Sequence, residues 1–217
     1  MVSLQFLGDV EHSRKADLPE PLLDAEFLRA VGYALRKHRT QRRKGKRVPY
    51  IEHLMGVCSL VLHYGGGQEE AIAALLHDVV EDQGGKPVLE EIRREFGERV
   101  AHIVQGCTDT DTSPKPPWEE RKKAYIAHVP TADASIRLVS AADKLHNSRA
   151  ILADYREIGD AVWDKFKKGR DGTLWYYREM VKALRSAPSD PRVNPLVDEL
   201  ERVVRALHRK VGVLHEP

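Results

Sequence analysis

The segment Ala71–Gln83, AIAALLHDVVEDQ, constrains the fold more than any other part of this 217-residue chain. Read as a helix, it is apolar on every side until His77 and Asp78 interrupt it, and a helix that is apolar all round is a buried one. An ionised carboxylate in a protein interior is very unfavourable without a cation or several hydrogen-bond donors beside it. The segment therefore predicts a core helix that carries polar chemistry into the interior.

Helical periodicity dominates the rest of the chain, and no convincing strand or hairpin pattern accompanies it. Glycine and proline mark the boundaries between the periodic segments. We expect helices at about 22–37, 50–63, 69–82, 88–96, 98–105, 119–128, 133–155, 174–185 and 194–211. The predicted fold class is all-α, with a single compact domain over residues 1–217 in which non-local helices meet around a shared interior.

One long connection interrupts this helical pattern. Residues 106–118, GCTDTDTSPKPPW, are too rich in Pro, Thr and Asp for regular structure. Loops of this length in a compact domain are usually functional or disordered. We expect this loop to move and to close over a bound substrate.

Composition excludes several classes of protein. With 41% hydrophobic and 31% charged residues the chain is typical of a soluble globular protein, and no apolar run approaches the ~20 residues that span a bilayer. The N-terminal sequence lacks the features of a signal peptide, so a cytoplasmic setting is expected. Cys58 and Cys107 stand far apart and outside any C-x-x-C pattern, which argues against disulfides and thiolate zinc sites. Any bound metal is therefore expected to have nitrogen and oxygen atoms of side chains as its ligands.

Positive charge is unevenly placed along the chain. Residues 36–47 carry eight Lys or Arg and no acid, although the formal net charge is +2. That small total argues against a nucleic-acid partner, and charge runs usually form solvated surfaces. A small anionic molecule, such as a nucleotide, is the partner that fits better.

A second acid lies on an apolar helix face. Ile136, Val139, Asp143 and Ala150 follow helical spacing, which places Asp143 in an apolar stripe, with Asn147 on the same face. His53, in the helix after Pro49, can supply a nitrogen to go with that of His77. Two His and two Asp without Cys form a set suited to Mn²⁺, Fe²⁺ or Zn²⁺.

Two further acids follow the buried pair at helical spacing. Glu81 lies four residues after His77, and Asp82 lies four residues after Asp78, so each pair is expected to stack one turn apart. Acids at a helix C-terminus oppose the helix dipole, which favours a functional reason for their presence. Carboxylates beside a metal site can take and return protons during hydrolysis.

The order His53, then His77-Asp78, then Asp143 resembles the H…HD…D signature of the HD phosphohydrolases. The blocks HRTQRRKGKRVPYIEH, ALLHDVVED and AADKLHN resemble the hydrolase domain of RelA/SpoT proteins, and especially the stand-alone small alarmone hydrolases. The resemblance runs from about residue 27 to 184. It implies an HD-domain helical fold with a core at about 22–185, a further helix at about 194–211, and a metal site between non-local helices.

The resemblance also implies an activity, a cofactor and a set of site residues. The family removes the 3′-diphosphate of guanosine 3′,5′-bis(diphosphate), ppGpp, to give GDP and pyrophosphate, usually with Mn²⁺. The implied assignments are metal ligands His53, His77, Asp78 and Asp143, catalytic acids Glu81 and Asp82, and substrate-binding residues Arg43, Lys44, Lys144 and Asn147. Val79 and Leu54 replace the Thr and Pro that are usual in the family, but neither change removes a ligand.

Several alternatives stay open. The substrate can be the adenosine analogue of ppGpp, the 2′-phosphate of NADPH or a nucleoside monophosphate, and an idle nucleotide-binding regulator is a further hypothesis. The complete ligand set and both acids argue against the regulator. The roles of Arg170, Trp175 and Tyr176, in nucleotide contact or in packing, are open, as are the choice among Arg42, Arg43 and Lys44 and assembly into a homo-oligomer. The remaining histidines are expected at the surface or in the core: His38, His63, His102, His128 and His146.

Overall fold

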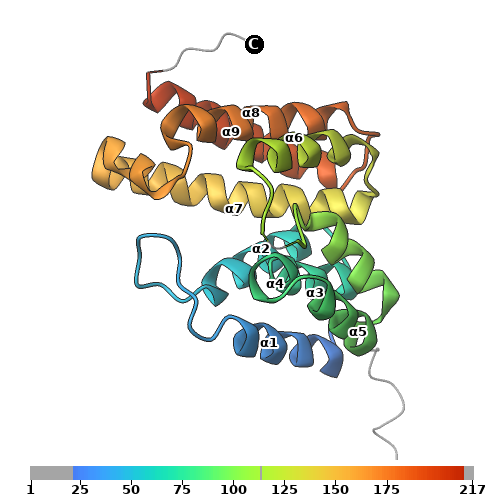
Figure 1. Ribbon diagram of the computed structural model, residues 1–217. Coiled ribbons are helices and arrows are strands. Elements are labelled where there is room, and N and C mark those ends of the chain that lie inside the picture. Colours follow the sequence, from blue (N-terminus) through green and yellow to red (C-terminus); the bar gives the residue numbers. More distant parts are fainter. Residues whose placement is uncertain (1–21, 113, 213–217) are drawn as a thin grey trace, which may run out of the picture.

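The computed structural model describes residues 22–112 and 114–212, and its regular elements are helical (Figure 1). No strand occurs within these ranges, where Arg42 and Pro49 form an isolated bridge. This confirms the all-α prediction. The elements are α1 (Ala25–Lys37), α2 (Ile51–His63), α3 (Gln68–Leu76), α4 (Val79–Gln83), α5 (Lys86–Cys107), α6 (Trp118–His128), η1 (Val129–Thr131), α7 (Ala134–Ile158), η2 (Gly159–Lys165), α8 (Gly169–Ser186) and α9 (Val193–Lys210).

The long helix α7 runs through the middle of the molecule and separates two groups of helices. In Figure 1, α1 to α5 lie on one side of it and α6, α8 and α9 on the other. Helix α7 packs against α2, α3 and α5 from the first group and against α8 and α9 from the second. Its side chains from Ser135 to Asp143 are all buried. Any polar group in that stretch must therefore find its partners inside the protein.

The apolar segment around His77 is buried as predicted, but it is not one helix. Every residue of α3 from Glu70 to Leu76 is buried, and α4 continues with the buried Val79 and Val80. Between them, Asp78 has φ −95° and ψ −7°, which differ by more than about 30° from the α-helical values near −63° and −42°. The prediction of a continuous helix over 69–82 was wrong, because the chain bends at the two residues whose side chains have polar partners in the interior.

Other boundaries differ where apolar periodicity was weak. Gly97, with φ 83° and ψ 169°, divides α5 into two helical parts, as its position between the two predicted helices suggested. Helix α8 begins at Gly169 rather than near 174, and the 3₁₀ segment η2 was not predicted. The first turn of α8 includes the exposed Arg170 and Asp171, so it carries no buried face for a pattern to reveal.

Asp133 fixes the start of α7 and joins it to α5. Its carboxylate accepts a hydrogen bond from the backbone N–H of Ile136 at 3.0 Å and contacts Arg99 Nη1 and His102 Nε2 at 2.9 Å each. Partial burial alone would raise the pKa of Asp133, but the bonds from Ile136, Arg99 and His102 outweigh it and lower the pKa to about 2. Side-chain caps of this kind satisfy an orphan N–H at the helix start.

Replacing Asp133 by Ala is expected to lower the free energy of unfolding by about 1 kcal/mol at neutral pH, since the cap and its charge are lost together. The folded-state pKa of Asp133 lies below its usual 3.8, so its contribution is present above that value and is lost as pH falls toward about 2. Urea unfolding from pH 7 to about pH 3 measures this. Asp133→Asn, which keeps a capping oxygen but no charge, is the control. The difference in unfolding free energy between Asp133→Asn and Asp133→Ala should change least with pH. A pH-independent effect of Asp133→Ala would contradict the charged-cap explanation.

Candidate metal centre

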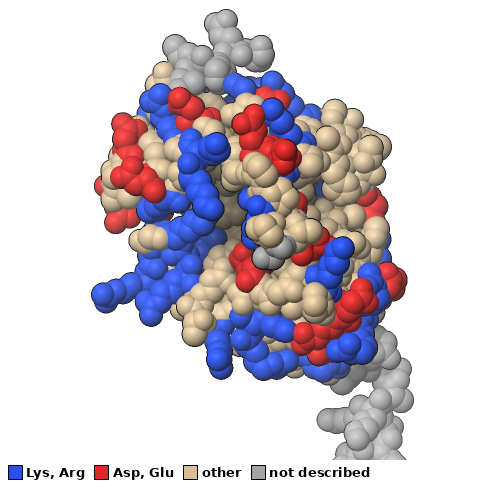
Figure 2. All heavy atoms as spheres, in the orientation of Figure 1, with Lys and Arg blue, Asp and Glu red and all other residues tan. Residues whose placement is uncertain are grey.

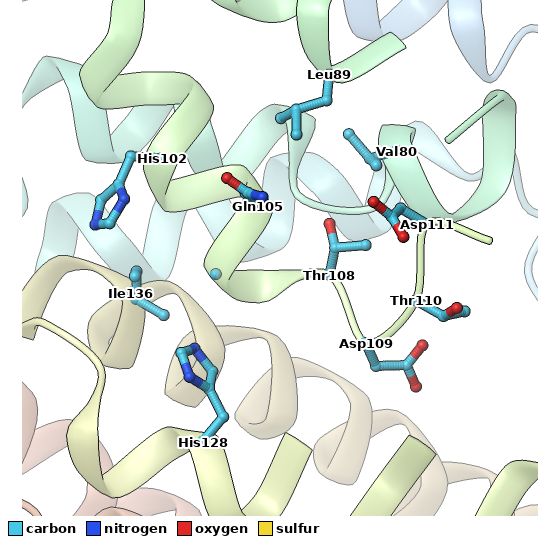
Figure 3. A pocket seen from close by; sticks show the side chains of 11 residues that line it. Val80, Leu89, His102, Gln105, Thr108, Asp109, Thr110, Asp111, His128 and Ile136 are labelled. Atoms are coloured by element: carbon cyan, nitrogen blue, oxygen red, sulfur yellow. The ribbon is translucent and has the colours of Figure 1, made fainter. Parts of the chain in front are cut away.

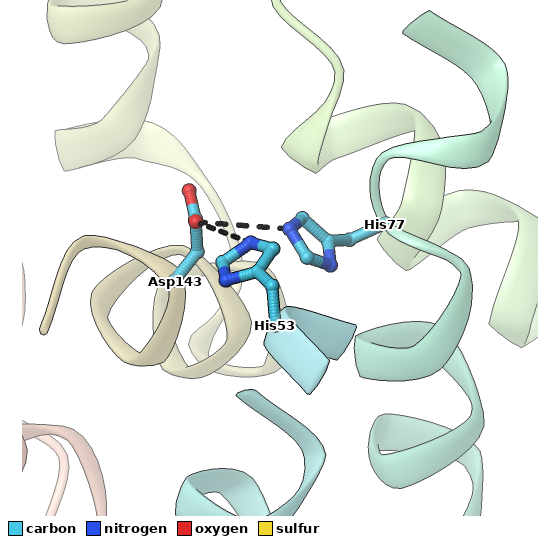
Figure 4. A group of neighbouring side chains, drawn as sticks. All are labelled: His53, His77 and Asp143. Atoms are coloured by element: carbon cyan, nitrogen blue, oxygen red, sulfur yellow. Dashed lines mark ion pairs between the residues drawn. The ribbon is translucent and has the colours of Figure 1, made fainter. Parts of the chain in front are cut away.

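Four side chains that are distant in sequence converge between the two groups of helices. His53 comes from α2, His77 ends α3, Asp78 begins α4 and Asp143 lies within α7. Figure 4 shows both imidazoles pointing toward the Asp143 carboxylate. One ligand atom from each of His53, His77 and Asp143 lies within 4.8 Å of the others. The sequence placed His53, the His77-Asp78 pair and Asp143 on three separate helices, and the fold brings them to one point.

Both imidazoles present the same ring nitrogen to this point. His53 Nε2 lies 3.2 Å from Asp143 Oδ1 and 3.5 Å from Asp78 Oδ2. His77 Nε2 lies 3.1 Å from Asp78 Oδ2 and 3.7 Å from Asp143 Oδ1. The Asp78 oxygen also accepts a hydrogen bond from the Tyr50 hydroxyl at 2.6 Å. Two nitrogens thus face two carboxylate oxygens across a small space.

The donor set fits a divalent cation. His53 and His77 are fully or almost fully buried, and within the described part of the chain neither Nε2 atom has a hydrogen-bond partner. His77 Nδ1 lies 2.8 Å from the Ala74 carbonyl, which can only accept, so that nitrogen carries the proton and Nε2 keeps its lone pair. Imidazole nitrogens with carboxylate oxygens are the ligands that Zn²⁺, Mn²⁺ and Fe²⁺ take. The residues present therefore fit a metal ion.

The two aspartates keep their negative charge in this buried setting. Burial alone would raise both pKa values. For Asp78 the adjacent imidazoles of His77 and His53 outweigh burial, and for Asp143 the charge of Lys144 and the same two imidazoles do so. Both pKa values are held well below the usual range. Lys144 Nζ and Asn147 Nδ2 each donate to the Asp143 carboxylate, which fixes its orientation.

Arg43 reaches the centre through the loop that connects α1 and α2. Its Nη2 donates to Asn147 Oδ1 at 2.8 Å, and its Cζ lies 5.8 Å from the centre of the Tyr50 ring. Arg43 is partly buried, whereas Arg42 and Lys44 are exposed. Of these three basic residues, Arg43 is the one whose contacts lead to the metal ligands.

The same loop is fastened to the end of α7. Asp154 is buried, and its carboxylate pairs with Lys46 Nζ and, at 3.0 Å, with Lys165 Nζ. Gly45 has φ +70°, and a Cβ there would lie 2.8 Å from Lys165 Cε, so the loop backbone lies close against that side chain. These contacts hold the loop in the position from which Arg43 contacts Asn147.

Glu81 and Asp82 point to different neighbours. Asp82 accepts a hydrogen bond from Gln41 Nε2 at 2.7 Å, on the loop between α1 and α2. Glu81 pairs with Lys115 Nζ at 2.9 Å, on the loop between α5 and α6, and lies 3.8 Å from Arg121 Nη1. Burial raises the pKa of both acids, with the charge of Asp109 adding to it for Glu81 and that of Asp78 for Asp82. A raised pKa suits a carboxyl group to proton transfer near neutral pH.

Thr108 to Asp111, in the predicted loop that follows α5, border a cavity of about 460 Å³ (Figure 3). The lining includes His102, Gln105, His128 and the loop residues Thr108 to Asp111, and none of the four candidate metal ligands. Asp109 is held by Arg121 Nη1 at 2.5 Å and Lys122 Nζ at 2.6 Å. The cavity is therefore separate from the metal centre, and closure of the loop over a substrate stays a prediction.

Basic side chains border the site at the surface. Figure 2 shows Lys and Arg gathered along one side of a hollow, over the loop between α1 and α2 and the neighbouring end of α7. The exposed cations of that loop are Arg39, Arg42, Lys44, Lys46 and Arg47. Such a surface attracts an anionic ligand by long-range electrostatics.

Sequence reasoning missed several residues beside the centre. Tyr50 contacts Asp78, Gln41 contacts Asp82, and His146 Nδ1 lies 3.0 Å from His53 Nδ1. His146 follows Asp143 by three residues, a helical spacing that could have indicated the shared face. Nothing in the local sequence pointed to Tyr50 or Gln41, since their partners are far away in the chain.

The residues left open by the sequence divide into two groups. Tyr176 and Tyr177 are buried, and Trp175 packs against Trp118 with ring centres 6.0 Å apart. Lys122 and Lys144 lie over the Tyr176 ring at 4.8 and 5.6 Å, so Tyr176 is connected to Asp143 through Lys144. Arg170 is exposed and pairs with Asp171. The rings of Tyr176, Tyr177 and Trp175 are thus packed within the fold, and a role for Tyr176, Trp175 or Arg170 in nucleotide contact stays a hypothesis.

Comparison with known proteins gives consistent results. The HD domain family matches residues 30–174. The chain is 38% identical over 168 residues to guanosine-3′,5′-bis(diphosphate) 3′-pyrophosphohydrolase MESH1 of Xenopus tropicalis, covering 76% of this chain and 88% of the relative. It is 40% identical over 175 residues to MESH1 of Mus musculus, covering 74% and 93%.

A longer bacterial relative and a solved structure show the same similarity to ppGpp hydrolases. The 3′-pyrophosphohydrolase of Aquifex aeolicus is 33% identical over 159 residues, which cover 73% of this chain and 21% of that protein. A structure described as a metazoan orthologue of SpoT that hydrolyses ppGpp superposes with a TM-score of 0.69 at 27% identity, over 92% of this chain and all of the other. No helix in residues 22–112 or 114–212 is long and apolar enough to cross a membrane.

Replacing Asp143 by Ala is expected to remove the bound metal, because one ligand oxygen and the anchor of Lys144 are lost together. The fall in affinity should exceed the roughly 10–100-fold typical of residues that only support a ligand. Metal content per chain after purification, measured by mass spectrometry, tests this. The exposed Asp164 offers a matched Asp→Ala control, which should retain full metal content. Unchanged metal in Asp143→Ala, in protein that is folded by circular dichroism, would refute this ligand set.

Proposed function

The chain belongs to the HD domain family, and from this membership we propose that it hydrolyses guanosine 3′,5′-bis(diphosphate), releasing pyrophosphate from the 3′ position and leaving GDP. The observation that carries the proposal is the convergence of two buried imidazoles and the buried Asp143 with the partly buried Asp78, and with two further acids one turn away. The MESH1 relatives, of whose length the chain covers 88% and 93%, are named for this reaction. The protein is an HD-domain phosphohydrolase.

The centre is proposed to hold one divalent ion through His53, His77, Asp78 and Asp143. Mn²⁺ is the first choice, with Fe²⁺ and Zn²⁺ as alternatives, since the donors are nitrogen and oxygen without thiolate. A bound ion of this kind lowers the pKa of water and neutralises negative charge on phosphate oxygens. The protein holds the His77 imidazole and both carboxylates in place for it through Ala74, Tyr50, Lys144 and Asn147.

Glu81 and Asp82 are proposed to move the protons of the reaction. Water adds to the phosphorus attached to the 3′ oxygen, and the bond between that phosphorus and the 3′ oxygen breaks. One acid accepts a proton from the attacking water, and the other returns a proton to the departing 3′ oxygen, so that the protons balance. The raised pKa values of both acids support their roles as proton acceptor and proton donor.

Arg43, Lys44, Lys144 and Asn147 are proposed to bind the nucleotide. Arg43 and Asn147 already contact each other beside the metal ligands, and a guanidinium group is well suited to phosphate oxygens. Lys144 is partly buried against Asp143, where its charge balances that carboxylate. Lys44 lies exposed on the basic loop, from which it would draw the anionic substrate toward the site.

A turnover panel with Mn²⁺ tests the substrate. ppGpp, its adenosine analogue, NADPH and a deoxynucleoside monophosphate are compared, and products are resolved by chromatography. The expected result is pyrophosphate release with the highest kcat/KM for ppGpp. A higher kcat/KM for another compound would be consistent with the proposed metal site but would contradict ppGpp as the substrate. Metal-loaded protein that turns over none of the four compounds would favour a nucleotide-binding regulator.

Asp82→Asn is expected to lower kcat by roughly 10²–10⁴, the contribution typical of a general acid or base. The amide keeps the shape of the side chain and its neighbour Gln41, so metal content should stay at the wild-type level. Steady-state kinetics with metal analysis on the same sample separates the two effects. The exposed Asp164 provides the matched Asp→Asn control. Turnover at the wild-type rate in Asp82→Asn would show that this acid has no part in the chemistry.

A further inference from the structure

The two candidate metal-binding histidines are supported in different ways. His77 Nδ1 faces the backbone carbonyl of Ala74 at 2.8 Å, whereas His53 Nδ1 faces Nδ1 of His146 at 3.0 Å. A carbonyl oxygen can only accept a hydrogen bond, so it fixes the protonated nitrogen of His77 without help. An imidazole nitrogen can donate or accept. Which ring nitrogen of His53 carries its proton therefore depends on which nitrogen of His146 carries the proton of that ring.

The required arrangement can be derived atom by atom. For His53 to offer the lone pair of Nε2 to a metal, its proton must sit on Nδ1 and be donated to His146 Nδ1. His146 Nδ1 must then be unprotonated, which places the proton of the neutral ring on Nε2. That atom lies 3.4 Å from Glu52 Oε1, a carboxylate that favours a proton on the nitrogen facing it. Glu52 also lies 3.8 Å from Arg43 Nε.

We infer that His146 is a positioning residue that fixes the tautomer and orientation of His53, with Glu52 fixing those of His146 in turn. The inference rests on the metal centre proposed above and adds a supporting chain that begins at the protein surface, since the Glu52 side chain is 51% exposed. Supporting hydrogen bonds of this kind orient metal-binding imidazoles and raise their basicity.

Helix α2 is shaped to receive the His146 ring. Glu52, His53 and Gly56 lie within one turn of α2, and a Cβ at Gly56 would lie 2.2 Å from His146 Nε2 and 2.3 Å from its Cδ2. Both distances are far below any van der Waals contact. The absence of a side chain at Gly56 therefore lets the ring lie against the helix, between Glu52 and His53.

Variants at His146 provide the first test, with Zn²⁺ as the probe and its Kd measured by chelator competition. His146→Leu removes the acceptor and is expected to weaken Zn²⁺ binding roughly 10–100-fold. His146→Asn keeps a carbonyl oxygen near the Nδ1 position and should recover most of the affinity. Equal affinity of wild type and His146→Leu would overturn the positioning role, as would an Asn variant no better than the Leu variant.

Gly56→Ala tests the same role without changing His146. The new methyl group displaces the ring, so Zn²⁺ affinity should fall as in His146→Leu, while the helix is favoured because Ala is a better helix former than Gly. Gly32→Ala in α1 is the matched control, since a Cβ there would meet its nearest neighbour, Arg36 Nη1, at an ordinary 3.6 Å. Wild-type affinity in Gly56→Ala would count against the proposal.

A direct readout comes from ¹⁵N–¹H NMR of the ¹⁵N-histidine-labelled, Zn²⁺-loaded full chain at mildly alkaline pH. The proposal predicts a proton on Nε2 of His146 and on Nδ1 of His53 and His77. A proton on Nδ1 of His146 would overturn it even if the variants weaken binding. Wild-type protein that binds no Zn²⁺ would overturn the metal centre together with this role, whereas tight wild-type binding with unaffected variants would overturn the role of His146 alone.

Discussion

The structure depends on how four polar side chains are accommodated where helices α2, α3, α4 and α7 meet. Charged carboxylates cannot be left without partners in a low-dielectric interior. Asp78 and Asp143 therefore face two imidazole nitrogens, and each carries further donors, from Tyr50 in one case and from Lys144 and Asn147 in the other. The bend of the chain between α3 and α4 serves the same requirement, because it turns both polar side chains of the buried segment into this shared space.

The residues proposed to bind substrate and the proposed catalytic acids extend outward from that space in two directions. Toward the loop between α1 and α2, Asn147 leads to Arg43 and Asp82 leads to Gln41. Toward the loop between α5 and α6, Glu81 leads to Lys115 and the charge cluster around Asp109. The proposed metal ligands lie on the packed helices or at their ends, whereas the groups that would meet the nucleotide lie at the helix edges and on loops, where binding residues are usually found.

Much of the centre could be predicted from sequence because its ligands interrupt apolar patterns. His77, Asp78 and Asp143 stand in segments that are predicted to be buried, and a charged carboxylate there needs a cation or several hydrogen-bond donors beside it. The bend at His77–Asp78 could not be predicted, since only the dihedral angles of Asp78 depart from α-helical values and no glycine or proline marks the position. Tyr50, Gln41 and His146 were missed for a related reason: their side chains meet the site across the fold, 28, 41 and 93 residues from their partners.

The separation of the ligands along the chain has a consequence for folding. His53 lies on α2 and Asp143 on α7, and no local segment contains a complete binding site, so the proposed metal site cannot form before α7 docks against α2. An ion that binds the native state alone stabilises it by mass action, by about 2.7 kcal/mol when its free concentration is a hundred times Kd. Such an ion acts as a removable cross-link between the two ends of the fold. Chelation would thus loosen the long-range closure of the domain while leaving each helix its own local hydrogen bonds.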